Sequence, residues 1–267
     1  MQKVNHSLRW YVDKIKKGER FSFSRYCSGE WMRIIDGIRK PFGLQYSNIR
    51  PDWLERAEGV KKWTKEEIFY APPDYCDAVT KTITEAHGGN SFLALQDIDY
   101  LKRCKTLDNR STRYDKIQKW LKENNINITW HNQSVMMAAG YKGELGPLTK
   151  ELYHLNTVVV GPPYLRPLPF YQHFIELPDP EKQHCWTVVD EIEGQLRQCK
   201  DAFICLSASS MSNVLIHRLY PVIGKHCWMI DFGAIWDVHV GEITRPKHRD
   251  MTPEIIKANL GGRTCQG

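Results

Sequence analysis

Residues 21–31 read FSFSRYCSGEW, and this stretch joins a strand pattern directly to the start of a helix. Phe21, Phe23 and the apolar ring of Tyr26 suit a half-buried strand. Ser28 is predicted as the N-cap of a helix over residues 29–38, whose apolar residues recur at helical spacing. α/β enzymes bind phosphates at such junctions.

The junction also carries a cation and a carboxylate. A helix N-terminus presents unpaired N–H groups and partial positive charge to an anion, and Arg25 adds a fork of donors. The alternative is an ordinary strand-turn-helix, in which Arg25 lies on the surface and Glu30 complements the helix dipole. The residues of the junction alone favour neither interpretation.

The alternation of strands and helices continues along the chain. The predicted strands are 21–26, 92–96, 126–130, 157–161, 173–177, 202–207 and 227–232, and the clearest predicted helices are 74–86, 111–123, 185–199 and 212–223. Near-continuous apolar strands between helices predict an α/β fold with a Rossmann-like, mostly parallel sheet and helices on both faces. We expect one domain over residues 1–267, with a Trp-rich excursion or lid at about 40–73 that carries Trp53, Trp63 and Tyr70.

Ligands of such sheets bind beyond the carboxyl ends of the strands. The loops expected to line one cleft follow Tyr26, Gln96, Gly161, Ser207 and Phe232. Gly161 precedes two prolines, and a glycine there permits close approach of the backbone to a nucleotide. The simpler alternative for this segment is a rigid turn.

A run of small polar residues follows one buried strand and opens a helix. Its members predicted to bind phosphate are Ser207, Ser209, Ser210 and Asn213. Their hydroxyl and N–H groups surround a diphosphate without bulky side chains in the way. Plain N-capping needs only one such residue, so the run favours phosphate binding. The Walker pattern of glycines and lysine is absent from it.

Segment 231–239 reads DFGAIWDVH and places two carboxylates and a histidine at a strand end and in the loop beyond it. Asp237 or His239 is predicted as a general base, and Asp231 as a structural residue. In the alternative, both Asp side chains merely accept backbone hydrogen bonds in turns. Arg245, in a basic loop further on, is predicted to close over phosphates. Other candidates at strand exits or in the same basic loop are His131, Asp97, Asp99, Lys247 and Arg249.

The amino-acid composition indicates which ligands, cellular location and cysteine chemistry to expect. The net charge of +6 favours anionic ligands or partners. No apolar run approaches the about 18 residues of a membrane span, and the first residues lack the apolar core of a signal peptide, so we expect a cytoplasmic protein. The eight cysteines are scattered and form no Cys-x-x-Cys pair, which predicts free thiols rather than disulfides or zinc.

The junction at 21–31 resembles the signature of the GT-D type glycosyltransferases, a former family of unknown function that reads Arg-aromatic-Gly-Asp-Gly-Glu after a strand. The residues that match are Arg25, Tyr26, Gly29 and Glu30. The chain departs at Cys27, where the family prefers glycine, and at Ser28, where it has the first carboxylate of its Asp-x-Glu motif. Further blocks resemble the family in the expected order at 130–132, 157–162, 202–208 and 229–234.

The resemblance implies transfer of a sugar from a nucleotide sugar, with a UDP-sugar favoured, to a hydroxyl of a glycan or of a modified DNA or RNA base. It implies that Arg25, Ser28 and Gly29 border the donor diphosphate. Glu30 is expected to act on a metal or on the sugar. Mn²⁺ or Mg²⁺ is the implied ion, and Ser28 predicts weaker binding than the two carboxylates of the family would give.

Two other functional classes are considered. A non-catalytic nucleotide or nucleic-acid binding module derived from this fold is the alternative that Ser28 suggests. A Rossmann-type oxidoreductase is disfavoured, because the Gly-x-Gly-x-x-Gly pattern is absent.

Overall fold

A computed structural model describes residues 2–36, 73–103, 112–178 and 186–265. Its eight strands form one sheet in the order β1-β4-β3-β2-β8-β7-β5-β6, and all neighbouring strands run parallel. The strands are β1 (Gln2–Val4), β2 (Ser22–Tyr26), β3 (Ser91–Leu95), β4 (Thr129–Asn132), β5 (Asn156–Gly161), β6 (His173–Glu176), β7 (Ala202–Leu206) and β8 (Trp228–Asp231). The predicted α/β class is confirmed.

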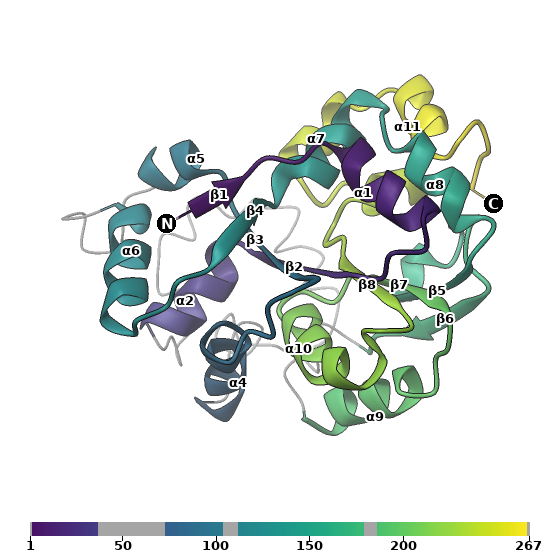
Figure 1. Cartoon of the computed structure of the whole chain (residues 1–267). Coiled ribbons are helices and arrows are strands. Elements are labelled where there is room, and N and C mark those ends of the chain that lie inside the picture. Colours follow the sequence, from purple (N-terminus) through teal and green to yellow (C-terminus); the bar gives the residue numbers. More distant parts are fainter. Residues whose placement is uncertain (1, 37–72, 104–111, 179–185, 266–267) are drawn as a thin grey trace, which may run out of the picture.

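Helices cover both faces of the sheet (Figure 1). One layer contains α1 (Leu8–Lys16), α7 (Ser134–Lys142), α8 (Gly146–Leu152) and α11 (Pro253–Asn259). The other contains α2 (Ser28–Asp36), α4 (Pro73–Thr84), α5 (Ile98–Arg103), α6 (Arg113–Glu123), α9 (Trp186–Leu196) and α10 (Met211–Ile223). The short 3-10 helices used below are η2 (Pro163–Leu165), η4 (Asp237–Val240) and η5 (Pro246–Asp250).

Strand β7 is apolar throughout because both of its faces are buried. In β7, Phe203 and Cys205 pack against the α1 and α7 layer, whereas Ile204 and Leu206 pack against the α10 layer. All five residues of this strand are buried. A strand covered by helices on both sides has no polar face, which is why its sequence shows a continuous apolar run instead of alternation.

Adjacent strands β2 and β8 send the chain to opposite faces of the sheet. After β2 the chain enters α2, in the layer of α4 and α10, and after β8 it passes into η4 and then α11 on the other face. The connections that follow these two neighbouring strands therefore diverge. The gap between two such connections is the usual place for a ligand in an open α/β sheet. The carboxyl ends of β2 and β8 therefore form the candidate site.

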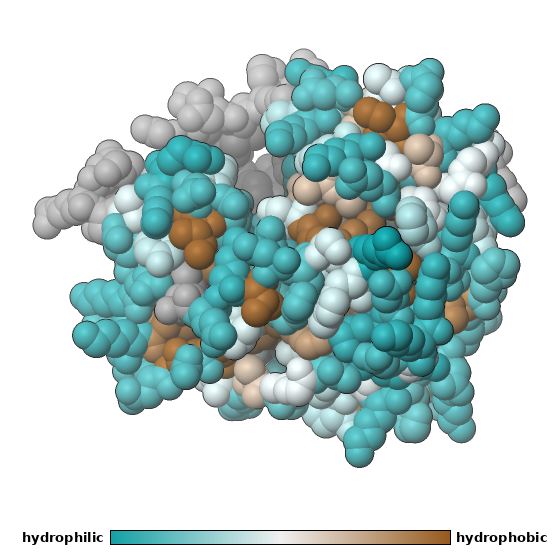
Figure 2. Space-filling view, turned by 45° about the horizontal axis from the view of Figure 1, so that its top comes forward, coloured by the Kyte–Doolittle hydropathy of each residue, from teal (hydrophilic) through white to brown (hydrophobic). Residues whose placement is uncertain are grey.

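Several other expectations concern the surface and the cysteines. The six cysteines in the described ranges are free, as predicted. Within those ranges, no helix has both the length and the apolar character that a bilayer crossing requires. Figure 2 shows a face on which hydrophilic residues predominate and apolar residues form small separate groups. The predicted excursion at 40–73 falls almost entirely outside the described residues.

Candidate functional site

Arg25, near the end of β2, points into the exit of β8. Its Nη1 donates a hydrogen bond to the carbonyl oxygen of Phe232 at 2.6 Å. Gly233 has a φ of +55°, and a Cβ at this position would lie 2.4 Å from the same Nη1 atom. A glycine is thus required here for two reasons, the left-handed backbone and the close approach of the guanidinium.

Two buried carboxylates lie near Arg25. Asp231 is 5% exposed and accepts the N–H of Gly233 at 2.9 Å through Oδ1. Glu30 is 8% exposed and accepts the N–H of Cys27 at 2.8 Å through Oε2. Each carboxylate therefore shapes a turn of the backbone: Asp231 the exit of β8, as the sequence predicted, and Glu30 the start of α2.

These four residues, Arg25, Cys27, Glu30 and Asp231, are called the Arg25 cluster below. Burial opposes the charge of Arg25, which is 6% exposed, yet Asp231, Cys27 and Glu30 together raise its pKa. Burial raises the pKa of Asp231 to about 6 and that of Cys27 to about 11. Arg25 is therefore a charged group held inside the protein, not the open fork of donors that the sequence suggested.

The start of α2 differs from the prediction by one residue. The helix begins at Ser28, and the carbonyl of Cys27 accepts its first hydrogen bond, from the N–H of Trp31 at 3.2 Å. Cys27 thus takes the N-cap position predicted for Ser28, and Glu30 caps it in return. The Cys27 thiol donates to Gln133 Oε1 at 3.1 Å, which ties this turn to the exit of β4. Gln133 was missed because a single glutamine before a helix gives no signal.

The serine-rich loop lies at the exit of β7. The N–H of Ser207 continues the ladder to Val160 at 2.8 Å, and a Cβ on Gly161 would lie 3.5 Å from the Ser207 Cβ. The predicted exits of β5 and β7 therefore meet. Ser209 is exposed with a φ of +50°, and Ser210 is buried.

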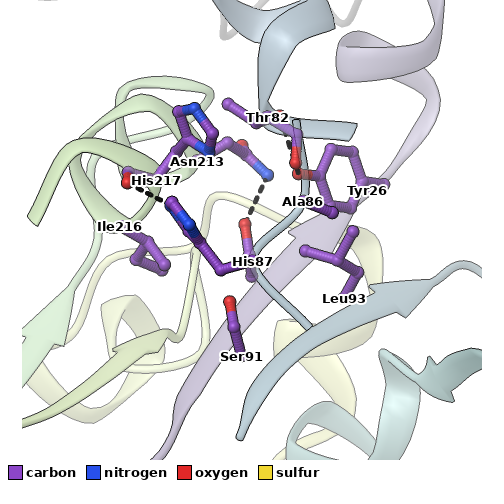
Figure 3. Close-up of a pocket in the computed structure, with 10 residues that line it drawn as sticks. Tyr26, Thr82, Ala86, His87, Ser91, Leu93, Asn213, Ile216 and His217 are labelled. Atoms are coloured by element: carbon purple, nitrogen blue, oxygen red, sulfur yellow. Dashed lines mark hydrogen bonds between the residues drawn. The ribbon is translucent and has the colours of Figure 1, made fainter. Parts of the chain in front are cut away.

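Asn213 has a different position from the one expected of a phosphate ligand. Its Nδ2 donates to Ser24 Oγ at 2.9 Å and to the carbonyl of Arg25 at 2.8 Å. Figure 3 shows the side chain directed at β2 beside a small pocket lined also by His87 and His217. Asn213 thus holds the backbone of β2 under Arg25 and uses both of its donors to do so.

We expect Asn213→Asp to lower the free energy of unfolding by about 2 to 4 kcal/mol at neutral pH, because it sets a buried carboxylate against the acceptor oxygen of Arg25. Urea unfolding followed by circular dichroism measures the loss. The matched variant Asn124→Asp, at an exposed helix end, is expected to change stability little. Equal losses in both variants would contradict the role given to Asn213.

A second polar group surrounds Asp237, which lies in η4 and is 3% exposed. Thr244 Oγ1 donates a hydrogen bond to Asp237 Oδ2, and the hydroxyl of Tyr164 is a further partner of the carboxylate. Burial raises the pKa of Asp237 to about 6 despite these bonds and the charge of Arg245. Helices η2 and η4 are in contact, which brings the exits of β5 and β8 together.

His239, the other base predicted from the sequence, is buried in the same turn. Its Nδ1 lies 3.0 Å from the carbonyl of Ile235 and must be the protonated nitrogen, because a carbonyl only accepts. Burial lowers the pKa of His239 to about 4, so the ring is neutral at pH 7. Asp237 is better suited than His239 to take up a proton, since its pKa lies closer to neutrality.

Tyr141, in α7, lies within electrostatic range of both Arg25 and Arg245. Burial raises its pKa, and the charges of Arg245 and Arg25 act in the opposite direction on the same phenol. Lys247 Nζ lies 5.4 Å from the centre of its ring. Arg245 is exposed and is held by a bond from Nη1 to the Thr244 carbonyl at 3.0 Å. Sequence reasoning missed Tyr141, because one tyrosine at a helix end usually serves packing.

Two of the remaining candidates, His131 and Asp97, make structural hydrogen bonds. The Nδ1 atom of His131 forms a hydrogen bond with the Tyr11 hydroxyl at 2.7 Å. The His131 ring stacks on that of Phe92, with 4.3 Å between the ring centres. Asp97 accepts the N–H of Tyr100 at 2.9 Å at the start of α5, and Asp99 lies within that helix. Lys247 and Arg249 are exposed on η5.

The sequence resemblance implies a divalent metal at Glu30. In the described ranges no group of three or more His, Cys, Asp or Glu side chains is arranged to hold an ion. Glu30 and Asp231 each give an oxygen to a backbone N–H, and the cation beside them is Arg25. Mg²⁺ is usually held by one or two carboxylates together with substrate phosphates and waters, so the described residues do not form a complete site by themselves, and the ion expected at Glu30 stays a prediction.

Comparison with known proteins shows a likeness at the level of structure. No protein-family model and no curated protein matches the chain. It resembles the solved structure described as a new glycosyltransferase (DUF1792) from Streptococcus sanguinis, with a TM-score of 0.54, 13% identity and coverage of 88% of this chain and 83% of that chain. A structure described as showing that the domain of unknown function 1792 has a distinct glycosyltransferase fold matches with a TM-score of 0.54 and 12% identity over 89% and 79% of the two chains. The chain therefore has the GT-D fold of these structures, as its signature at residues 21–31 predicted.

Proposed function

We propose that this protein is a glycosyltransferase that moves a sugar from a nucleotide sugar, with a UDP-sugar as the favoured donor, to a hydroxyl of a glycan or of a modified nucleic-acid base. The observation that carries the proposal is the shared fold with a structure described as a glycosyltransferase. The polar groups around Arg25 and Asp237 support it, because both lie at the carboxyl edge of the sheet. This is the edge at which α/β folds bind nucleotides.

Positive charge at this edge suits the diphosphate of the donor. Arg245 and Lys247 are exposed and lie near Tyr141, on the side of the sheet to which β8 exits. The exits of β5 and β7 meet at Gly161 and Ser207, where a Cβ on Gly161 would lie 3.5 Å from the Ser207 Cβ. When the bond between sugar and phosphate breaks, the electron pair stays on the diphosphate, and these cations stabilise its charge.

Asp237 is proposed as the base. Its raised pKa leaves the carboxylate ionised above about pH 6 but still basic enough to accept the proton of an acceptor hydroxyl. Thr244 holds one carboxylate oxygen and so fixes the orientation of the other. The acceptor oxygen forms its bond to the sugar as it loses its proton to Asp237, and the nucleoside diphosphate departs.

A panel of nucleotide sugars tests the proposal. The full chain is incubated with each donor, with and without Mn²⁺, and release of the nucleoside diphosphate is measured. Turnover of at least one donor is the expected result. Absence of turnover and of nucleotide binding contradicts it. DNA or RNA binding whose affinity falls steeply with salt would then favour the non-catalytic alternative.

Arg245→Ala is expected to weaken UDP binding by about tenfold, which corresponds to about 1.4 kcal/mol for one charge-assisted contact. Isothermal titration with UDP measures the change. Lys200→Ala removes a charge immediately before β7, at the opposite edge of the sheet, and is expected to leave the affinity unchanged. A loss of the same size in both variants would indicate a general charge effect and not a contact with the donor.

A further inference from the structure

The carboxylate of Asp237 is not part of the Arg25 cluster and has two hydroxyl partners of its own, those of Thr244 and Tyr164. We infer that Tyr164 is a positioning residue for Asp237, whose phenol donates a hydrogen bond that holds the carboxylate in place as a proton acceptor. The inference rests on the proposed function in one respect, because Asp237 is the base of that function. Tyr164 itself transfers no proton and keeps its own throughout the reaction.

The turn that follows β5 explains why a tyrosine stands at this place. Gly161 ends the strand, and a Cβ on it would lie 2.8 Å from Leu165 Cδ1, so the glycine leaves the space that the leucine fills. Leu165 is fully buried, and its N–H donates to the Pro162 carbonyl at 3.0 Å. Pro162 and Pro163 fix two φ angles of the same turn. The rigid turn that the sequence suggested therefore anchors η2, and with it Tyr164.

Helix η2 carries Tyr164 to the 3-10 helix that contains Asp237. The two helices are in contact, and the Tyr164 hydroxyl forms a hydrogen bond with the Asp237 carboxylate. Tyr164 is 38% exposed and Asp237 is 3% exposed, so the bond joins a surface side chain to a buried carboxylate. Burial and the charges of Asp237 and Glu242 raise the pKa of Tyr164. The phenol therefore keeps its proton and is the donor of the bond.

The groups that face Asp237 act on its carboxylate in opposite directions. Burial is the largest influence and raises the pKa of Asp237 to about 6, even though two hydroxyl partners and one cation lower it and one carboxylate adds to the rise. His239, on the same 3-10 helix, is neutral because burial lowers its pKa to about 4. The described groups that act on the carboxylate are Thr244, Arg245, Tyr164 and Glu242. A hydrogen bond to the ionised form favours that form, so loss of the Tyr164 hydroxyl should raise the pKa of Asp237.

Carbon-13 NMR of the full chain is the direct test. The aspartate carboxyl carbons are labelled and titrated with pH, and the signal that is absent from Asp237→Asn belongs to Asp237. Tyr164→Phe keeps the ring, removes only the hydroxyl, and lies at a surface position that tolerates the change. We expect this variant to raise the pKa of Asp237 by about one pH unit, the usual effect of losing one hydrogen bond to a charged group.

Tyr171→Phe is the matched control. It also removes a phenol hydroxyl from the segment between β5 and β6, but that hydroxyl donates to the Arg166 carbonyl at 2.7 Å and not to a carboxylate. The titration of Asp237 in this variant should match that of the wild type. An unchanged titration in Tyr164→Phe, with circular dichroism like that of the wild type, overturns the inference, and so does an equal rise in both variants.

Transfer kinetics give a second readout and separate the two proposals. In Tyr164→Phe the acidic limb of kcat/KM should move to higher pH together with the carboxyl titration, which a purely structural role would not cause. A limb that stays in place while the titration moves also overturns the inference, because Tyr164 then acts on a carboxylate that is not the base. Absence of turnover in the wild type counts against the proposed function alone, and the carboxyl titration then decides whether Tyr164 holds Asp237.

Discussion

Asp237→Asn is expected to abolish sugar transfer and, at the same time, to make the protein more stable at pH 8. The loss of activity should be about 100-fold or more, the usual contribution of a general base. The amide has nearly the same shape and still reaches the Thr244 hydroxyl, but it accepts no proton from the substrate. Initial rates at saturating donor measure the first effect, and thermal unfolding measures the second.

The sign of the stability effect follows from burial. The pKa of Asp237 is raised from 3.8 to about 6 in the folded protein, so burial disfavours the ionised form by about 3 kcal/mol. This cost is fully present above pH 6, where the carboxylate is ionised in both states, and it disappears as the pH falls through 6 toward 4. The variant should therefore unfold several degrees above the wild type at pH 8, and the two should converge near pH 4.

The same shift predicts the pH profile of the wild type. The value of kcat/KM should fall by about tenfold per pH unit below pH 6, as Asp237 becomes protonated. Asp250→Asn, which removes an exposed carboxylate at the end of η5, serves as the control and should retain both the rate and this profile. A wild-type profile that stays flat down to pH 4.5, about one and a half units below that pKa, would rule out Asp237 as the base.

Gly233→Ala is expected to lower the free energy of unfolding by about 3 kcal/mol or more. The backbone strain of an alanine at a φ of +55° accounts for about 1 kcal/mol of this loss. The larger part comes from Arg25, because the new Cβ would lie 2.4 Å from Nη1 and displace it from the Phe232 carbonyl. A buried guanidinium that loses its acceptor carries its full desolvation cost.

Gly241→Ala provides the matched control for that variant. Gly241 has a φ of +89°, and a Cβ there would meet no atom within 4 Å. It therefore reports backbone strain alone, and its loss of stability should be the smaller of the two. Urea unfolding of both variants gives the difference. If the two losses agree, Arg25 does not depend on the space that Gly233 leaves.

The sequence predicted the sheet well because its strands are buried on both faces. A run such as residues 202–206 is apolar throughout, and a short run of this kind between two helices is typical of a buried parallel strand. Strand β1 escaped prediction, since Gln2–Val4 is short, partly polar and defined only by its pairing with β4. The order of the strands in the sheet could not be predicted from the sequence either, because strand pairing depends on contacts between segments that are distant along the chain.

The sequence predicted which strand exits carry the candidate residues, but not how their side chains are directed. Residue types at strand exits identified Arg25, Asp231 and Asp237, because parallel strands bring their carboxyl ends to one edge. The direction in which each side chain points could not be predicted in the same way. Asn213 was assigned to phosphate and instead donates to β2, and Tyr141 gained its position only when α7 packed near η5. Such outcomes depend on tertiary packing, which one sequence does not reveal.

The position of β8 has a consequence for how the molecule assembles. Strands β1 to β4 form one flank of the sheet and β5 to β7 the other, and β8, the last strand along the described chain, is the only one that pairs with both. A polypeptide emerging from the ribosome therefore has two unjoined flanks until its final strand inserts between them. The acceptor carbonyl for Arg25 arrives just after that strand, so we expect closure of the sheet and completion of the candidate site to coincide late in folding.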